Sequence, residues 1–241
     1  MLIPYLGEKS KFSNFILPRI PESIDFYVEP FGGMFGIYFC MDLSKYQNTK
    51  FIYNDVNYLN FNLFKHLKNS EFISYFLEFN VTEDYYEIAK SNINNVNDFN
   101  KALYWLIILT CSKSQANLLD GVWSGDQEFE IMKIKIISNK NYLENIHDIS
   151  NIDYKEIIKK YDSKDTFFYM DPPYFGKEKY YLNHDFIGVD KHHELSQVLK
   201  NIKGKFALSY IFFDQLEDWY TDQNMYTIKN FMGHEVLITN Y

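Results

Sequence analysis

The tetrapeptide Asp171-Pro172-Pro173-Tyr174 follows directly on an apolar run, TFFYM, at positions 166–170. A short run of large apolar residues indicates a strand that is buried on both faces, as in a parallel sheet. Two successive prolines fix φ and remove two backbone donors, so a central strand cannot continue through them. The chain must therefore leave the sheet at Asp171, at the carboxyl end of a strand, where open α/β sheets bind ligands.

The same four residues suit the recognition of a planar amino group. The carboxylate of Asp171 and the carbonyl of Pro172 are neighbouring acceptors, and the ring of Tyr174 offers a flat surface for stacking. The simpler interpretation is an acidic turn that happens to follow a core strand. A single short motif does not decide between these two interpretations, because such matches also arise by chance.

Strands and helices are expected to alternate along most of the chain. The other expected strands cover residues 25–31, 50–53, 134–138, 205–210, 225–229 and 235–240, and the expected helices cover residues 55–67, 71–94, 98–113, 153–161 and 191–202. This order predicts an α/β fold with a doubly wound, mainly parallel sheet. The last two strands follow each other closely, which predicts an antiparallel pair at one edge. Asp55 and Asp98 are the expected N-caps of their helices, and residues 34–41 the expected start of another.

One compact domain over residues 1–241 is expected, because no internal repeat and no linker rich in proline, glycine or serine divides the chain. Only one stretch breaks the alternating pattern. Residues 112–130 are rich in serine, glutamine, asparagine and glycine around Trp123 and Phe129, which predicts a loop-rich insert over about residues 112–133.

The charge balance argues against a generic nucleic-acid binder. The chain carries 32 acidic and 24 basic residues, a net charge of −8, whereas such proteins are usually basic. A local basic patch is still compatible with this balance. Arg19 is the only arginine, so bidentate reading of guanine by arginine is almost unavailable and base contacts would fall to Lys, Asn, Gln and Ser.

Several features point to a soluble, cytoplasmic protein without a structural metal. Cys40 and Cys111 lie in apolar surroundings without ligand spacing, which indicates reduced cysteines. No signal peptide is evident, and the longest apolar stretch, residues 102–111, is half the length that spans a bilayer. His192, His193 and Glu194 are adjacent, and adjacent side chains diverge on a helix, so we expect the exposed start of a helix and no metal site.

Two earlier strand ends carry groups suited to a nucleoside. The first expected strand ends in Glu29-Pro30-Phe31-Gly32-Gly33, and glycines at such a turn let the backbone approach a ligand closely. The spacing is not G-x-G-x-x-G, so a pyrophosphate is not required. The second expected strand ends in Asp55, which is placed to accept hydrogen bonds from ribose hydroxyls.

The order of these motifs resembles the Dam-like, D12-class family of DNA adenine-N6 methyltransferases. The resemblance covers nearly the whole chain: PYLGEK at positions 4–9 is similar to the family's N-terminal segment, EPFGG at 29–33 to its cofactor loop, and FFYMDPPY at 167–174 to its catalytic strand and motif. Tyr180, Phe186, the segment 205–209 and the segment 235–240 follow the family's order as well. The resemblance implies a Rossmann-like, seven-stranded methyltransferase sheet with an antiparallel edge strand.

The resemblance also implies a cofactor, a substrate and roles for single residues. The cofactor is S-adenosylmethionine, and the substrate is an adenine, flipped out of a specific short DNA sequence, that is methylated at N6. The implied cofactor residues are Tyr5, Lys9, Glu29, Pro30, Phe31, Gly32, Gly33, Asp55 and Asp171, and the implied catalytic residues are Asp171, Pro172, Pro173 and Tyr174. Lys9 is also placed to reach DNA.

Three departures from the family pattern bear on the target. Glu8 stands where the N-terminal motif has a second glycine, which puts a carboxylate near the cofactor or a phosphate. Asn141-Tyr142 follows the expected third strand, where the family often has Asp-Phe beside the cofactor's adenine. The insert lacks evident basic recognition residues, and its candidate DNA contacts are Lys113, Ser114, Gln115 and Asn117.

Two alternative functions remain open at this point. The same chemistry on RNA or single-stranded DNA needs only an extruded base. A non-catalytic partner with this fold would fit the acidic charge and Glu8, but would have no need to keep both Asp55 and the Asp171 motif. The sequence leaves open whether the chain forms a homodimer or pairs with another subunit.

Overall fold

The computed structural model describes all residues except 1, 6–8, 114–117, 179–180, 182–183 and 231–232. Its centre is a seven-stranded sheet in the order β3-β2-β1-β4-β5-β7-β6. The strands are β1 (Phe26–Glu29), β2 (Lys50–Asn54), β3 (Ile146–Ser150), β4 (Thr166–Met170), β5 (Lys205–Ile211), β6 (Asn224–Asn230) and β7 (Gly233–Thr239). β1 to β5 are parallel, whereas β7 is antiparallel to β5 and β6. The α/β sheet predicted from the sequence is confirmed, including its antiparallel edge.

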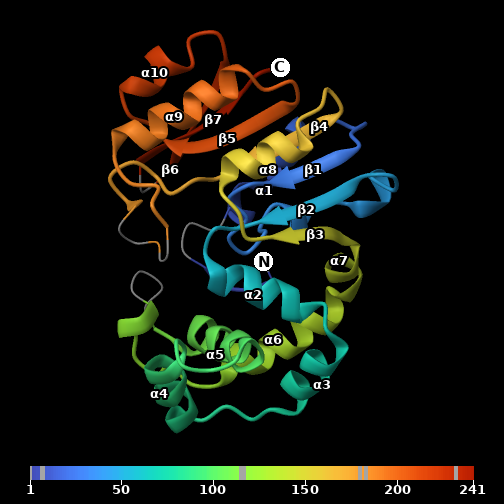
Figure 1. The fold of residues 1–241 in the computed structure, drawn as a ribbon, viewed down its shortest axis with the longest axis vertical. Coiled ribbons are helices and arrows are strands. Elements are labelled where there is room, and N and C mark those ends of the chain that lie inside the picture. Colours follow the sequence, from blue (N-terminus) through green and yellow to red (C-terminus); the bar gives the residue numbers. More distant parts are fainter. Residues whose placement is uncertain (1, 6–8, 114–117, 179–180, 182–183, 231–232) are drawn as a thin grey trace.

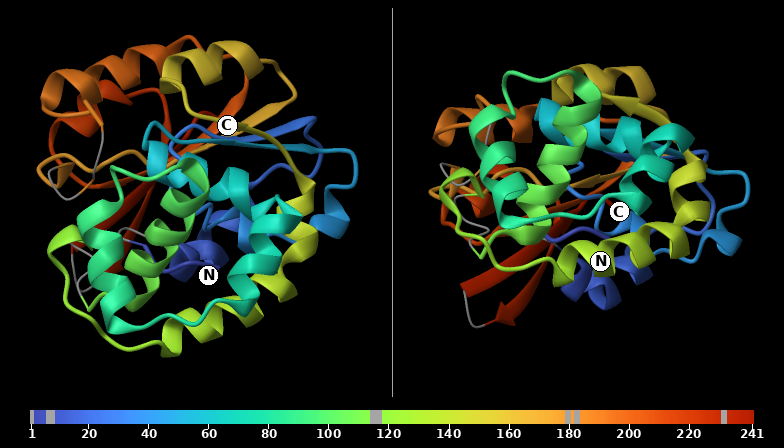
Figure 2. Two further views of the ribbon diagram at one scale, coloured as in Figure 1. Left: turned by 60° about the horizontal axis from the view of Figure 1, so that its bottom comes forward. Right: turned by 90° about the horizontal axis from the view of Figure 1, so that it is seen from below.

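Helices cover both faces of this sheet, as expected for a doubly wound fold (Figure 1). One side carries α8 (Tyr154–Tyr161), α9 (Val189–Lys200) and α10 (Gln215–Trp219). The other side carries α2 (Tyr58–Leu67), α3 (Ser70–Glu78), α4 (Glu83–Asn92), α5 (Asp98–Cys111), α6 (Gln127–Ser138) and α7 (Lys140–Asn145). The short α1 (Ser13–Ile16) lies between 3₁₀ turns near the N-terminus. Figure 2 shows α2 to α6 gathered together beneath the strands.

The central strand β4 separates two hydrophobic cores. Phe167 and Tyr169 belong to the core shared with α2 to α6, whereas Phe168 and Met170 belong to the core shared with α8 and α9. Successive side chains of a strand point to opposite faces, so a strand covered on both sides reads as a continuous apolar run. All five residues of β4 are buried, which explains why its apolar run predicts it correctly.

The third strand was predicted in the wrong place. Residues 134–138 form the end of α6, and β3 begins only at Ile146. In α6 the buried residues are Phe129, Met132 and Ile136, which is helical spacing, while Ile134 is 67% exposed. The isoleucines of this segment suggested a strand, but their burial follows the 3.6-residue period of a helix.

Several boundaries also differ from those predicted. The N-cap of α2 is Asn57 and not Asp55, and the N-cap of α5 is Asn97 and not Asp98. The helix expected over residues 71–94 is divided into α3 and α4, and residues 34–41 contain only the short 3₁₀ turn Tyr38–Cys40. The second part of the expected loop-rich insert is helical, because α6 starts at Gln127, and Leu118–Asp120 forms a 3₁₀ turn.

We expect Gly204→Ala to destabilise the fold by roughly 1–3 kcal/mol, because the added methyl group has no space. A Cβ at Gly204 would lie 2.8 Å from the carbonyl oxygen of Thr166 and 3.0 Å from that of Ser163. The midpoint of urea-induced unfolding measures the effect. The neighbouring exposed substitution Lys203→Ala is the control and should shift the midpoint little; equal midpoints for both variants would contradict the expectation.

Candidate active site

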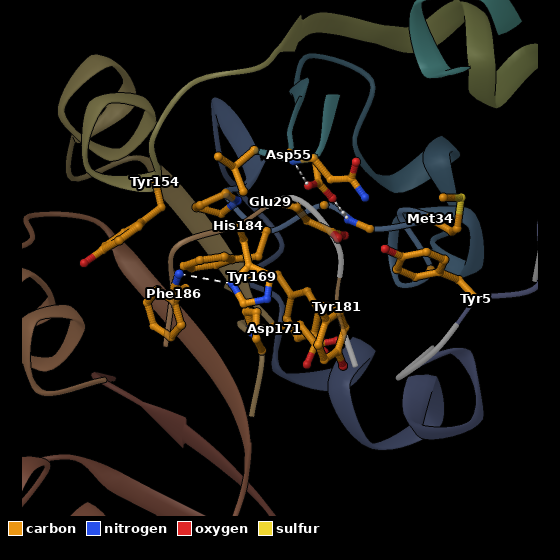
Figure 3. A pocket seen from close by; sticks show the side chains of 18 of the residues that line it. Tyr5, Glu29, Met34, Asp55, Tyr154, Tyr169, Asp171, Tyr181, His184 and Phe186 are labelled. Atoms are coloured by element: carbon orange, nitrogen blue, oxygen red, sulfur yellow. Dashed lines mark hydrogen bonds between the residues drawn. The ribbon is translucent and has the colours of Figure 1, made fainter. Parts of the chain in front are cut away.

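A cavity lies where the carboxyl ends of β1, β2 and β4 meet, and its empty volume, open mouth included, is about 960 Å³. Open α/β sheets bind their ligands at this edge, outside the carboxyl ends of the strands. Figure 3 shows Tyr154, His184 and Phe186 on one side of the cavity and Tyr5 and Met34 on the other. The sequence-predicted residues that line it are Tyr5, Lys9, Glu29, Pro30, Phe31, Gly32, Gly33, Asp55, Asp171 and Pro173.

The glycine turn after β1 lies directly against β2. Gly32 N–H donates to the carbonyl of Asn54 at 2.7 Å, and a Cβ at Gly32 would lie 2.4 Å from the ring of Tyr53. Gly33 has a φ of 50°, in the left-handed region that favours glycine. The turn therefore needs glycine at both positions, and it presents bare backbone to the cavity.

Asp55 is fixed by three hydrogen bonds. Its Oδ2 accepts from Gly33 N at 2.8 Å and from Asn60 Nδ2 at 3.1 Å, and its Oδ1 accepts from Asn57 N at 2.7 Å. Oδ1 keeps one lone pair for a further donor, since each carboxylate oxygen accepts two. Burial raises the pKa of the Asp55 carboxyl to about 6, although the three hydrogen bonds lower it in part.

The same network reaches the N-terminal segment. Asn60 Nδ2 also donates to the hydroxyl of Tyr5 at 3.2 Å, and Asn60 Oδ1 accepts from Trp105 Nε1 at 2.9 Å. Asn60 and Trp105 are buried on α2 and α5. Two helices beneath the sheet thus hold Tyr5 and Asp55 on the same side of the cavity.

Asp171 forms an ion pair with Lys9 at the floor of the cavity. Lys9 Nζ lies 3.1 Å from Asp171 Oδ1 and 4.6 Å from the centre of the Tyr174 ring. Burial raises the pKa of the Asp171 carboxyl, and the Lys9 ammonium opposes this rise. Apart from this ion pair, Oδ1 is buried and accepts no hydrogen bond of good geometry from the described part of the chain.

Tyr174 lies between this ion pair and the carboxyl group of Glu235. It is 6% exposed, and its hydroxyl donates to Glu235 Oε2 over 3.4 Å. Burial raises the pKa of Glu235, and nearby Lys9 opposes this rise. Of the catalytic residues implied by the sequence, Asp171 and Pro173 line the cavity, whereas Pro172 and Tyr174 are not among its described lining residues.

Glu29 is a second buried acid on this floor. It is 2% exposed and accepts a hydrogen bond from the hydroxyl of Tyr27 at 2.6 Å. Burial raises the pKa of Glu29 well above its ordinary value, and the charge of nearby Asp171 adds to the rise. Glu29 ends β1 and Asp171 directly follows the adjacent parallel strand β4, so the fold itself brings the two carboxyl groups together.

An acidic–aromatic pair after β3, which was not predicted from the sequence, also lines the cavity. Asp153 accepts from Lys155 N at 2.8 Å and caps α8, while the Tyr154 ring stacks on Phe31 with 5.2 Å between centres. The expected pair, Asn141-Tyr142, lies in α7 and is not among the described lining residues. A third strand placed at residues 146–150 would have identified the correct pair.

The segment after Asp171–Tyr174 supplies another wall of the cavity. Tyr181, His184, Asp185 and Phe186 all line it, and only Phe186 among them could be singled out from the sequence. His184 Nδ1 accepts from Phe186 N at 3.1 Å, which fixes a tight turn (Figure 3). No sequence pattern marks this turn.

Most of the candidate DNA contacts lie outside the described residues. This holds for Ser114, Gln115, Asn117 and also for Glu8. Lys113 is exposed, and its backbone N–H donates to the carbonyl of Val122 at 3.0 Å, beside the bridge between Ser112 and Trp123.

Two further expectations concern metals and membranes. In the described ranges, no group of three or more His, Cys, Asp or Glu side chains is arranged to hold a metal ion. His193 is exposed as expected, but His192 is fully buried, so the prediction of an exposed helix start is wrong for this residue. Among the residues that the structure describes, no helix is both long and apolar enough to span a membrane.

Comparison with known proteins gives one match that extends over most of the chain. The family model of the D12 class N6 adenine-specific DNA methyltransferases matches residues 5–233. No curated protein sequence matches the chain. The matched range contains all three strand ends that build the cavity, from the glycine turn to Asp171. The chain therefore belongs to the D12 class of N6 adenine-specific DNA methyltransferases.

Proposed function

We propose that the cavity binds S-adenosylmethionine and that Asp171 and Tyr174 receive an adenine flipped out of DNA. The observation that carries this proposal is the single cavity lined by both Asp55 and Asp171. Asp55 is held by three hydrogen bonds, as a nucleoside-binding residue needs, and Asp171 retains unused acceptor capacity. A methyl donor and an amino acceptor have to meet in one enclosed space, and this cavity has both kinds of partner.

The residues present fit S-adenosylmethionine in chemistry. Gly32 and Gly33 form a tight turn against β2 that lines the cavity with backbone. The free lone pair of Asp55 accepts a ribose hydroxyl, and the mutually stacked rings of Phe31 and Tyr154 beside Asp153 offer an apolar surface with an acceptor for adenine. When bound, the cofactor supplies an electrophilic methyl group on a sulfonium centre.

Asp171 and Pro172 act on the target amine. An exocyclic amine is a poor nucleophile because its lone pair is delocalised into the ring. Two acceptors, the Asp171 carboxylate and the Pro172 carbonyl, hold its two hydrogens and stabilise the positive charge that develops on nitrogen. Positioning this nitrogen in line with the methyl group contributes much of the rate. Tyr174 supplies the stacking surface that a base loses when it leaves the duplex.

Lys9 lies at the place proposed for the target amine. Its ammonium lies against both Asp171 and the ring of Tyr174, the two groups that the adenine requires. The ammonium therefore compensates a buried carboxylate until the amine arrives, and it has to move aside when the base enters. A lysine that leaves Asp171 in this way remains within reach of the DNA backbone.

The domain and partner assignments follow from the same proposal. Residues 1–241 form one methyltransferase domain, and residues 112–133 contribute to target recognition through Lys113, Ser114, Gln115 and Asn117. The partner is DNA with an adenine in a specific short sequence. RNA, single-stranded DNA and a non-catalytic role are the outcomes against which this assignment is tested.

The first test is methyl transfer from labelled S-adenosylmethionine to duplex DNA, single-stranded DNA and RNA. We expect incorporation into duplex DNA at adenine N6. Asp171→Ala should lower kcat on the order of 100-fold or more, because charge developing on the amine loses an acceptor, while cofactor affinity stays within a few-fold. Asp55→Ala should instead weaken cofactor binding by at least about tenfold.

The exposed substitution Asp190→Ala is the matched control and should change neither quantity. Incorporation that survives Asp171→Ala would overturn the proposed mechanism. Cofactor binding without transfer to any of the three nucleic acids would favour the non-catalytic partner. Preferential transfer to RNA or single-stranded DNA would replace the duplex assignment.

The second test is the pH dependence of cofactor binding. The pKa of Asp55 is raised from 3.8 to about 6 in the folded protein, so its ionisation lowers the stability of the fold progressively between about pH 4 and about pH 6, and by a constant amount above that. A hydroxyl donor prefers the ionised carboxylate, so binding should be constant above about pH 6 and weaken by up to about tenfold per pH unit below it. Calorimetry with S-adenosylhomocysteine from pH 4.5 to 8 measures this, with Asp55→Asn as control. A variant with the same pH profile as the parent would exclude Asp55 as the titrating group.

A further inference from the structure

A chain of three buried polar side chains lies behind the wall of the cavity. His192 on α9 is fully buried, with Nδ1 2.8 Å from the Tyr210 hydroxyl and Nε2 3.1 Å from Glu178 Oε1. Tyr210 belongs to β5, and Glu178 follows the catalytic motif. None of the three is among the described residues that line the cavity. They are therefore not catalytic residues, and their role has to be exerted through other residues.

In this series of three side chains, the protonation states determine which group donates each hydrogen bond and which accepts it. Burial lowers the pKa of the His192 imidazole, which favours the neutral ring. The pKa of Glu178 is also lowered, because hydrogen bonds from its surroundings outweigh its burial, so the carboxylate is ionised. The carboxylate accepts from Nε2–H of His192, which leaves Nδ1 to accept from the Tyr210 hydroxyl. All three groups are thus satisfied in one arrangement.

Glu178 connects these three side chains to the cavity wall through two hydrogen bonds. Its carbonyl accepts from His184 Nε2 at 3.0 Å, and its Oε1 accepts from Gly188 N at 3.4 Å. His184 Nδ1 in turn accepts from Phe186 N, which matches the neutral tautomer with hydrogen on Nε2. The turn from His184 to Gly188 is therefore held at both ends by one residue.

The ring of His192 also packs directly against the wall. It meets the Phe186 ring edge to face, with 4.8 Å between centres, and Phe186 in turn meets Phe31 at 5.5 Å. On its other side His192 contacts the ring of Phe175, next to Tyr174, at 5.6 Å. Phe31 and Phe186 both line the cavity. Displacement of His192 thus removes both a hydrogen-bond anchor and the apolar support of the wall.

We infer that Glu178 and His192 are positioning residues that hold His184, Asp185 and Phe186 as the wall of the cofactor site. The inference rests on the proposed function in so far as the cavity binds S-adenosylmethionine. The competing explanation is that His192 only stabilises the core around α9. The two explanations differ in whether cofactor affinity falls by more than the loss of global stability accounts for.

The test compares His192→Phe with two other buried changes. His192→Phe removes both hydrogen bonds, and Tyr210→Phe removes only the hydroxyl that donates to Nδ1, so the second variant should fold even if the first does not. Leu199→Ala creates a cavity in the same helix without touching the wall and is the control for global stability. His193→Gln is the control for an exposed neighbour.

We expect His192→Phe to weaken S-adenosylhomocysteine binding about tenfold or more, with kcat at saturating cofactor within about threefold of the parent. Tyr210→Phe should act in the same direction and more weakly. In the ligand-free protein, the amides of Phe186 and Gly188 should exchange at least tenfold faster in His192→Phe, with those of β4 unchanged. His193→Gln should change none of these quantities.

The inference fails if the affinity is unchanged, or if Leu199→Ala weakens binding as much at an equal loss of unfolding free energy. It also fails if exchange at Phe186 and Gly188 stays at the parent rate. A parent protein that binds no S-adenosylhomocysteine would overturn the proposed function instead. In that case the exchange rates alone would decide whether Glu178 and His192 hold the wall.

Discussion

The parallel pairing of β1 with β4 is the contact on which the site depends. Val28 lies opposite Phe168, so the residues that follow both strands leave the sheet side by side. Glu29 ends one strand and the glycine turn follows it, while Asp171 follows the other strand, so the pairing makes these groups direct neighbours at one edge of the sheet. The pairing is in turn fixed by burial, because a shift of one residue would exchange the side chains of the two cores.

Ionisation of the buried carboxyl groups at this edge of the sheet costs free energy, and nearby positive charge offsets only part of this cost. Burial raises the pKa values of Glu29, Asp55 and Asp171, in a chain whose net charge is already −8. Lys9 is the cation closest to the last of these acids. A positively charged ligand is therefore favoured by the site as a whole, whereas polyanionic DNA has to be attracted by local groups. This division fits the proposed function, in which a cationic cofactor binds inside and a nucleic acid binds at the rim.

The fold could be predicted from the sequence where burial produces an unambiguous pattern. The strand at 166–170 and the ends of β1 and β2 follow from short apolar runs that stop at proline, glycine or aspartate. The isoleucine-rich end of α6 was mistaken for a strand because a short apolar run fits both periods. That one error displaced the search for an acidic–aromatic pair from Asp153-Tyr154 to Asn141-Tyr142. The buried His192 was missed because its partners are 14 and 18 residues away in sequence.

The division of β4 between two cores has a consequence for how the molecule folds. Neighbouring residues such as Phe167 and Phe168 contact different helical layers, although they are joined by one peptide bond. Truncation of Phe167 perturbs mainly the core shared with α2 to α6, and truncation of Phe168 perturbs mainly the core shared with α8 and α9. Substitutions at Phe167 and Phe168 therefore test the cooperativity of folding. If each substitution destabilises both helical layers equally, the two halves of the protein fold as one unit.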